Sequence, residues 1–268
     1  MTRFTATGVT SLGASAFKGC SNLEFISLGA ITQLKSMTFD ECKKMQTVLL
    51  GSPNTLTEIG ERAFDNCTNL VSVGSTQGAV NLPSVVKVGD YAFNYCSSVQ
   101  KMILQELKNV GRDAFRYLGT STTLETIEVP KLEVASGDYT FGHVKLDELY
   151  LPSITSLPAF AFGYTAIKNL HFGPGLTTLG STGNQAFMFN DYNTELTERN
   201  LFFEGTTPPT FKSVTFMTDY NFDPSQSSTL LPLTKIHVPS GCKEAYKTAL
   251  HNANAAYDAY FDIIVEDL

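Results

Sequence analysis

Large apolar residues recur along the chain at regular intervals, separated by short polar stretches. The most regular of them is a phenylalanine preceded by alanine or threonine, and consecutive copies lie 21 to 29 residues apart. These phenylalanines are Phe17, Phe39, Phe64, Phe93, Phe115, Phe141, Phe162 and Phe187. An aliphatic residue, often followed by glycine, lies five positions before most of them, and cysteine or an aliphatic residue lies three positions after. The repeat therefore reads aliphatic-Gly-x-x-Ala-Phe-x-x-Cys-x-x-Leu-x-x-Ile-x-Leu.

Each part of this repeat predicts a local structure. Its Ile-x-Leu end, for example Ile26 and Leu28, alternates with period two and predicts a short strand with one buried face. The Phe and the Cys, such as Phe64 and Cys67, are three residues apart and would share one face of a helical turn. A unit of this length cannot bury its apolar face alone, so the units must stack. The sequence predicts a repeat solenoid with a parallel sheet of short strands and short helical turns on the other side.

The repeat resembles the BspA-like leucine-rich repeats of bacterial surface proteins and some protists. The stretch Leu56-Thr-Glu-Ile-Gly-Glu-Arg-Ala-Phe-Asp-Asn-Cys-Thr-Asn-Leu70 carries the resemblance most closely. The likeness extends over about residues 9–205, with a weaker match at Ile236–Tyr246. It implies a right-handed leucine-rich-repeat β-α superhelix that acts in binding or adhesion, usually in a secreted or cell-surface bacterial protein.

Three departures from the repeat shape the expected organisation. The spacing widens before Phe93, where a strand is expected either at Ser72-Val73 or at Val80-Asn-Leu82, and both can pair. Residues 189–232 are irregular and polar. After Pro239, apolar residues recur at three- and four-residue intervals, which predicts a helical C-terminal cap over residues 240–261.

We therefore expect a solenoid of about eight repeats over residues 1–205 and a final irregular coil, last strand and helical cap over residues 206–268. The chain enters a repeat almost at once. This predicts either that residue 1 is an artificial boundary or that a removed N-terminal segment supplies the other cap.

Composition narrows the class of partner. The chain of 268 residues holds 19 Lys and Arg against 26 Asp and Glu, a net charge of −7. This balance lacks the basic excess expected of nucleic-acid or anionic-membrane binders. No apolar run approaches the ~18 residues of a membrane helix, and the first residues show no apolar signal core. We expect no nucleic-acid partner and no membrane insertion of this segment.

Candidate chemistry is sparse. Cys20, Cys42, Cys67 and Cys96 each belong to a different repeat, so they predict a core ladder rather than a metal site or a disulfide framework. Residues 219–227 carry alternating oxygen ligands like the start of a calcium-binding loop but lack its glycine and its final glutamate. Residues 175–182 have the glycine spacing of a phosphate loop without its lysine, and the four histidines are scattered. We expect no enzyme activity, no cofactor and no metal.

The outward positions of the predicted strands remain as the candidate site, because the concave sheet of a solenoid is its usual binding surface. The partner-binding residues expected there are Leu49, Ile103, Glu128, Glu148, Tyr150, Asn169, His171, Phe202, Lys235 and His237. They predict a non-enzymatic module that binds a protein or glycan, such as a host or matrix component. The alternative is an intracellular or assembly scaffold with a purely structural role. A hydrolase would need clustered carboxylates on one face, and only Glu128 and Glu148 come close.

Overall fold

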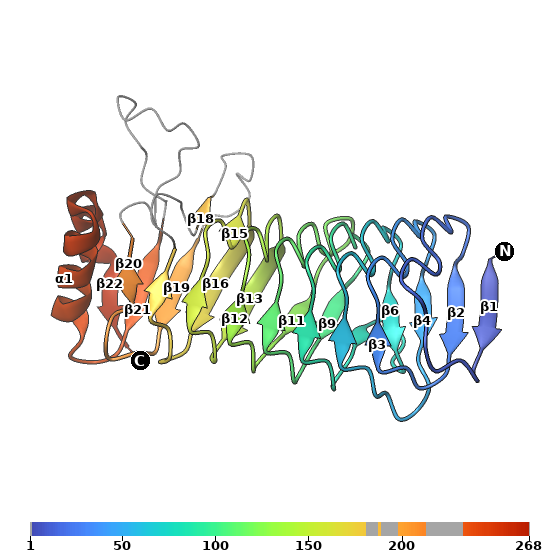
Figure 1. Cartoon of the computed structure of the whole chain (residues 1–268). Coiled ribbons are helices and arrows are strands. Elements are labelled where there is room, and N and C mark those ends of the chain that lie inside the picture. Colours follow the sequence, from blue (N-terminus) through green and yellow to red (C-terminus); the bar gives the residue numbers. More distant parts are fainter. Residues whose placement is uncertain (1, 181–186, 189–197, 213–232, 268) are drawn as a thin grey trace.

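The computed structural model describes residues 2–180, 187–188, 198–212 and 233–267. The chain winds into an elongated solenoid with the N-terminus at one end and helix α1 near the other (Figure 1). Within each described sheet, the neighbouring strands pair in parallel, one from each successive coil or nearly so. A repeat solenoid built on parallel sheets, as the sequence predicts, is therefore the architecture of this protein.

Sheets 1 and 3 contain the Ile-x-Leu strands of the repeat. Sheet 1 is formed by β1 (Arg3–Ala6), β2 (Phe25–Leu28), β4 (Thr47–Leu49), β6 (Ser72–Gly74), β7 (Val80–Asn81), β9 (Lys101–Ile103) and β11 (Thr126–Glu128). Sheet 3 is formed by β13 (Lys145–Leu151), β16 (Ala166–Phe172), β19 (Asn200–Phe203), β21 (Lys235–Val238) and β22 (Ile264–Glu266). Strand β13 follows β11 along the solenoid and contacts it (Figure 1). We call the outer surface of sheets 1 and 3 the long-strand face.

Sheet 2 runs along the coils beside them and was not predicted as a separate sheet. Its strands are β3 (Gln33–Leu34), β5 (Glu58–Ile59), β8 (Lys87–Val88), β10 (Asn109–Val110), β12 (Val134–Ala135), β14 (Ser156–Leu157), β17 (Thr178–Leu179) and β20 (Thr210–Phe211). Each places one residue inward, and in β3, β5, β8, β10 and β14 this residue, such as Ile59 or Val88, is the aliphatic five positions before the repeat phenylalanine. Two further short strands, β15 (Phe162–Gly163) and β18 (Phe187–Met188), pair with each other.

The predicted helical turns are wrong. The Ala-Phe-x-x-Cys segments form stacked turns in which the residues two before and two after the phenylalanine adopt left-handed backbone, as Arg62 (φ 53°) and Asn66 (φ 57°) do around Phe64. The Phe64 N–H then points along the solenoid and donates to the Ala92 carbonyl of the next coil at 2.8 Å. In a helix this N–H would bond within its own segment. Hydrogen bonds between coils therefore replace the helix.

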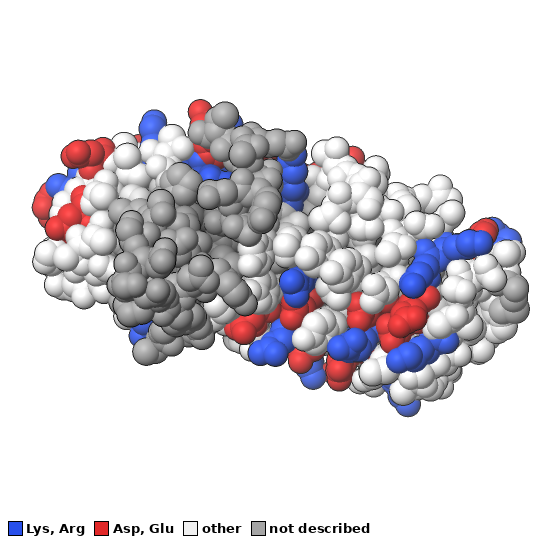
Figure 2. Space-filling view, turned by 90° about the horizontal axis from the view of Figure 1, so that it is seen from above, with Lys and Arg blue, Asp and Glu red and all other residues white. Residues whose placement is uncertain are grey.

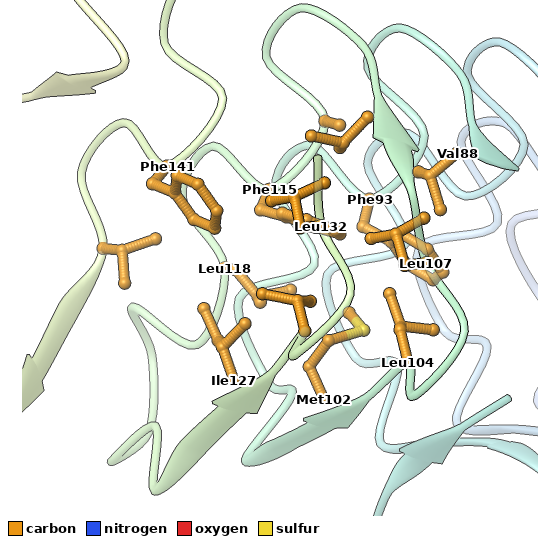
Figure 3. Packing of buried hydrophobic residues seen from close by; sticks show 14 of the residues in the cluster. Val88, Phe93, Met102, Leu104, Leu107, Phe115, Leu118, Ile127, Leu132 and Phe141 are labelled. Atoms are coloured by element: carbon orange, nitrogen blue, oxygen red, sulfur yellow. The ribbon is translucent and has the colours of Figure 1, made fainter. Parts of the chain in front are cut away.

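The interior is a column of repeated side chains. Phe39, Phe64 and Phe93 are fully buried and stack with ring-centroid distances of 5.4 and 5.1 Å. Figure 3 shows the same arrangement farther along, where Met102 and Ile127 from strands β9 and β11, with leucines from the loops, pack beside the phenylalanine rings. Burial of one large ring in each coil gives the stack its hydrophobic stabilisation.

The widened spacing before Phe93 is occupied by both of the alternative strands. Strand β6 pairs with β7 through Val73 and Val80, and β7 pairs in turn with β9, so the sheet is continuous. Both side chains are fully buried, so the extra residues add a strand to the core without interrupting it.

Near the C-terminus the chain forms helix α1 (Lys243–Ala253), the 3-10 helix η1 (Ala255–Ile263) and strand β22. Tyr246 and Leu250 of α1 are fully buried, and the Tyr246 hydroxyl donates to the Gly205 carbonyl at 2.7 Å. Strand β22, which the sequence pattern did not reveal, pairs with β21 and extends sheet 3.

Candidate functional site

The ten residues expected to bind a partner all belong to strands of the long-strand face. Leu49 and Ile103 are half-buried on sheet 1. They occupy the same register position, but Gly74 and Asn81 hold that position on the two strands between them. The structure therefore leaves these two side chains apart. Glu128 follows Ile103 in register at the end of sheet 1. The other seven residues lie together on sheet 3.

An aromatic row runs across sheet 3. The rings of Tyr150, His171, Phe202 and His237 occupy the same position on four successive strands. Each ring stacks on the next with a centroid distance of 4.1 Å and an interplanar angle of 15° or less. The parallel register places equivalent side chains one strand apart, close to the ~4.8 Å spacing of strands, so flat rings fit face to face. We call these four residues the sheet-face aromatic row.

A polar row runs parallel to it, two residues earlier on each strand. Glu148, Asn169, Asn200 and Lys235 share this position. Asn200 Nδ2 donates to Asn169 Oδ1 at 2.8 Å, and Asn169 Nδ2 donates to Glu148 Oε1 at 2.6 Å. Because each asparagine donates to the residue on the preceding strand, the orientations of both amides are fixed. The row is therefore preorganised for a ligand.

Glu148 joins the two rows. Its Oε2 atom lies 2.7 Å from His171 Nε2. Partial desolvation and the neighbouring Glu148 carboxylate raise the pKa of the Tyr150 phenol above its usual value. Tyr150 is therefore a neutral hydroxyl at physiological pH, able to donate as well as accept.

Exposure differs along the sheet-face aromatic row. The Tyr150 side chain is 54% exposed, the highest value among the described large apolar residues. His237, expected as an outward contact, is only 8% exposed, because its ring packs on Phe202 and its Nδ1 atom bonds Asp267 at 2.8 Å. The accessible part of the row is its Tyr150 end.

A second aromatic row lies on the stacked turns, and the sequence reasoning missed it. Tyr95, Tyr117, His143 and Tyr164 stack with centroid distances of 4.3, 4.0 and 4.8 Å. All four adopt left-handed backbone, with φ between 56° and 59°. We call them the turn-face aromatic row. A signal was present in the sequence, because each of these residues lies two positions after a repeat phenylalanine in consecutive repeats.

Arginine side chains pack among the aromatic residues of the turns. The Arg116 guanidinium lies 5.1 Å from the Tyr117 ring centroid and 4.8 Å from that of Tyr139, and it pairs with the buried Asp113 at 3.1 Å. Burial and the Arg116 charge lower the pKa of His143 to about 4. Neutral His143 therefore behaves as a stacking ring in this row at physiological pH.

Charges on the surface are interleaved. In the view onto the turns, Lys and Arg alternate with Asp and Glu instead of separating by sign (Figure 2). Many pairs bridge neighbouring coils, for example Lys87 with Glu58 at 3.0 Å and Lys131 with Glu106 at 2.6 Å. The surface shown offers no broad single-sign field for steering a polyelectrolyte.

The repeated cysteines are structural. Cys42, Cys67 and Cys96 are fully buried free thiols, whereas Cys20 in the first coil is exposed. Burial raises the pKa of the Cys42 thiol to about 12, and those of Cys67 and Cys96 well above their usual value. Protonated buried thiols are poor nucleophiles and poor metal ligands.

Among the described residues, no group of three or more His, Cys, Asp or Glu side chains is placed to hold a metal ion. The degenerate calcium-like loop at 219–227 lies outside the described residues, as does the end of the 175–182 phosphate-loop-like stretch. Every helix in the described part of the chain is too short or too polar to cross a lipid bilayer.

Comparison with known proteins identifies the repeat. The model of the BspA type leucine rich repeat region matches residues 2–82 and 73–194, with six copies. The chain therefore belongs to the BspA-type leucine-rich-repeat family, as the sequence resemblance suggested. No curated protein sequence matches it.

Three solved structures of leucine-rich repeat proteins show a partial similarity to this chain. A leucine-rich repeat protein of Bacteroides ovatus is 17% identical, with a TM-score of 0.49, 92% of this chain covered and 65% of that one. A T. pallidum leucine-rich repeat protein is 19% identical, with a TM-score of 0.42, 55% of this chain covered and 72% of that one. A leucine rich cell surface protein of Faecalibacterium prausnitzii is 14% identical, with a TM-score of 0.39 and coverages of 100% and 91%.

Proposed function

We propose that this chain is a non-enzymatic binding or adhesion module that recognises a protein or glycan partner through the long-strand face. The sheet-face aromatic row is the observation that carries the proposal. Four rings stacked across four strands, beside a hydrogen-bonded polar row, form an ordered surface in which Tyr150 is mostly exposed. Rigid aromatic side chains supply contact area at low entropic cost and dominate many recognition surfaces.

Family membership supports an extracellular or cell-surface location. The sequence resemblance is to the BspA-like repeats of bacterial surface proteins, and one of the similar solved structures is described as a cell surface protein. In this setting the repeats of residues 1–205 present most of the binding face, strand β21 adds Lys235 and His237 to it, and helix α1 closes the C-terminal end of the solenoid. Burial of Tyr246 and Leu250, which helix α1 contributes to the end of the core, supports that capping role.

A structural role inside the cell is the second candidate, and Cys20 favours it. This thiol is free and exposed, and oxidising environments modify exposed thiols. Labelling intact cells with an antibody and an impermeant biotin reagent separates the two locations. Labelling without cell lysis supports the surface module, and labelling only after lysis supports the scaffold.

A binding screen followed by substitution tests the proposed function. The purified chain is applied to a glycan array and to immobilised extracellular-matrix proteins, and the affinity of each binder is then measured. Phe202→Ala should weaken binding by about tenfold or more, because it removes a ring from the middle of the row. Val134→Ala on sheet 2, where the side chain is 37% exposed, should leave the affinity unchanged. Equal effects of the two substitutions, or no binder in either screen, would count against the long-strand face.

A further inference from the structure

The sheet-face aromatic row exposes a complete ring face at one end. Inside the row each ring is covered on both sides, so His171 and Phe202 present mainly their edges to a ligand. Tyr150 is covered by His171 on one side, and no described ring stacks on its other side. The neighbouring strand toward the N-terminus is β11, which ends in Glu128. The 54% exposure of Tyr150 is the result.

Exposed carboxylates lie on the strand that carries this ring and on the strand next to it. Glu128 is exposed on the adjacent strand, and Gln105 Nε2 donates to its Oε2 atom at 2.7 Å. Glu148, two residues before Tyr150 on the same strand, is fixed by Asn169 and His171. Ionised carboxylates only accept hydrogen bonds, so this surface favours a ligand rich in O–H donors.

The chemistry of the ligand follows from these two features. The face of an aromatic ring carries negative charge density, and the C–H groups on one side of a pyranose ring carry partial positive charge and form a flat apolar surface. The sugar hydroxyls project from the rim of that surface, where carboxylate oxygens can accept from them. An anionic glycan would instead be repelled by the two fixed carboxylates.

We propose that the free face of Tyr150 is the docking site for a neutral pyranose unit of a glycan, with Glu128 and Glu148 accepting hydrogen bonds from its hydroxyls. This inference rests on the proposed function, because it names the ligand class of the same face. An apolar peptide fits the surroundings less well, because Glu148 beside the ring and Glu128 on the adjacent strand are both exposed.

Titration of the whole chain with defined oligosaccharides tests the inference. The probes are neutral hexasaccharides of glucose, mannose, galactose and N-acetylglucosamine, with an oligogalacturonate of the same length as the anionic comparison, and binding is followed by calorimetry and by NMR. At least one neutral probe should bind saturably, and the oligogalacturonate should not. Tyr150→Ala should weaken that binding by about tenfold or more, as loss of a central aromatic contact does.

Three further variants separate the roles of ring, carboxylate and exposure. Tyr150→Phe keeps the ring and should retain most of the affinity. Glu128→Gln removes the ionised acceptor. It should weaken binding of the neutral probe and should reduce the difference in affinity between the neutral probe and oligogalacturonate. Tyr95→Ala removes the 40% exposed end ring of the turn-face aromatic row and should have no effect. Melting curves recorded for every variant establish that each one is folded.

The failures are distinguishable. Absence of saturable binding to every neutral probe, or equal binding to wild type and Tyr150→Ala, overturns the pyranose site. If a matrix protein nevertheless binds and loses affinity in Phe202→Ala, the proposed function of the face stands without the sugar site. If a neutral probe binds and only Tyr95→Ala weakens its binding, the sugar site lies on the turns and both proposals for the long-strand face fail.

Discussion

The thiol of Cys67 donates to the carbonyl oxygen of Phe39, one coil earlier, at an Sγ–O distance of 3.1 Å. The same bond recurs from Cys42 to Phe17 and from Cys96 to Phe64, at 3.0 and 3.2 Å. The cysteine of the repeat is therefore a buried donor that joins adjacent coils as well as a small apolar side chain.

Substitution of Cys67 by serine should be mild, because the Phe39 carbonyl can accept from the new hydroxyl. We expect Cys67→Ser to lower the free energy of unfolding by about 1 kcal/mol, since a hydrogen-bonded hydroxyl still loses its hydration on burial. Chemical denaturation followed by circular dichroism measures this change. A loss as large as that caused by Phe64→Ala would show that the hydroxyl finds no acceptor.

Phe64→Ala should be one of the most damaging single changes. The ring is fully buried between Phe39 and Phe93, and the stacked coils cannot collapse around the void. We expect a loss of about 3–5 kcal/mol in the free energy of unfolding. The matched control is Phe17→Ala in the first coil, where the ring is only half-buried and the cost should be clearly smaller. Equal costs at the two positions would contradict the packing described.

The sequence predicted the core because the phenylalanines, cysteines and strand aliphatics recur in one register, and burial demands that register. It did not predict the turns. Left-handed backbone at Arg62 or Glu41 is unfavourable for an isolated residue and is stabilised by hydrogen bonds between coils, which no local pattern reveals. The second sheet was missed because strands such as Glu58–Ile59 contain one inward residue each, too few to show alternation.

Part of the candidate site could be predicted from the sequence, because the register of the strands determines which side chains point outward. Outward positions on sheet 3 followed from strand register, so Tyr150, His171 and Phe202 could be assigned to one face. The burial of His237 depends on Asp267, 30 residues later and beyond the helical segment, and could not be inferred from the strand alone.

Glycine at position 89 lies where two neighbouring coils approach each other closely. A Cβ atom there would be 2.7 Å from the Glu61 nitrogen and 2.9 Å from the Gly60 carbonyl carbon. Gly89→Ala should therefore lower the free energy of unfolding by about 1–3 kcal/mol, because two backbones must move apart. Thermal and chemical denaturation check the change.

Gly13 holds the same repeat position in the first coil and provides the control. A Cβ atom at Gly13 would meet nothing within 4 Å. Gly13→Ala should be neutral or stabilise by about 0.4–1 kcal/mol, because alanine restricts the unfolded chain. Destabilisation by Gly13→Ala equal to that at Gly89 would indicate that close approach between coils is not the cause.

His143 should make the fold sensitive to mild acid. Its pKa is lowered from 6.5 to about 4 by burial and by Arg116, so the unfolded chain binds a proton in this range that the folded chain does not. The contribution of neutral His143 to stability is complete above pH 6.5, falls as the pH drops from 6.5 toward about 4, and changes no further below that.

His143→Tyr isolates this effect, because tyrosine matches the neighbouring rings of Tyr117 and Tyr164 and does not titrate in this range. Urea denaturation at intervals between pH 7.5 and 4 compares the two proteins. The difference in unfolding free energy should grow in favour of the variant as the pH falls. A constant difference across the range would show that His143 titrates equally in the folded and unfolded chains.

The comparison of the two aromatic rows tests the central claim most directly, which is that recognition uses the long-strand face. Affinity for the partner found in the screen is measured for the double variants Tyr150→Ala/Phe202→Ala and Tyr95→Ala/Tyr117→Ala, each of which removes two rings from one row. The sheet-face variant should lose about 2 kcal/mol of binding free energy per ring while remaining folded, and the turn-face variant should bind like wild type. Loss of binding in the turn-face variant, with wild-type affinity in the sheet-face variant, would contradict the claim.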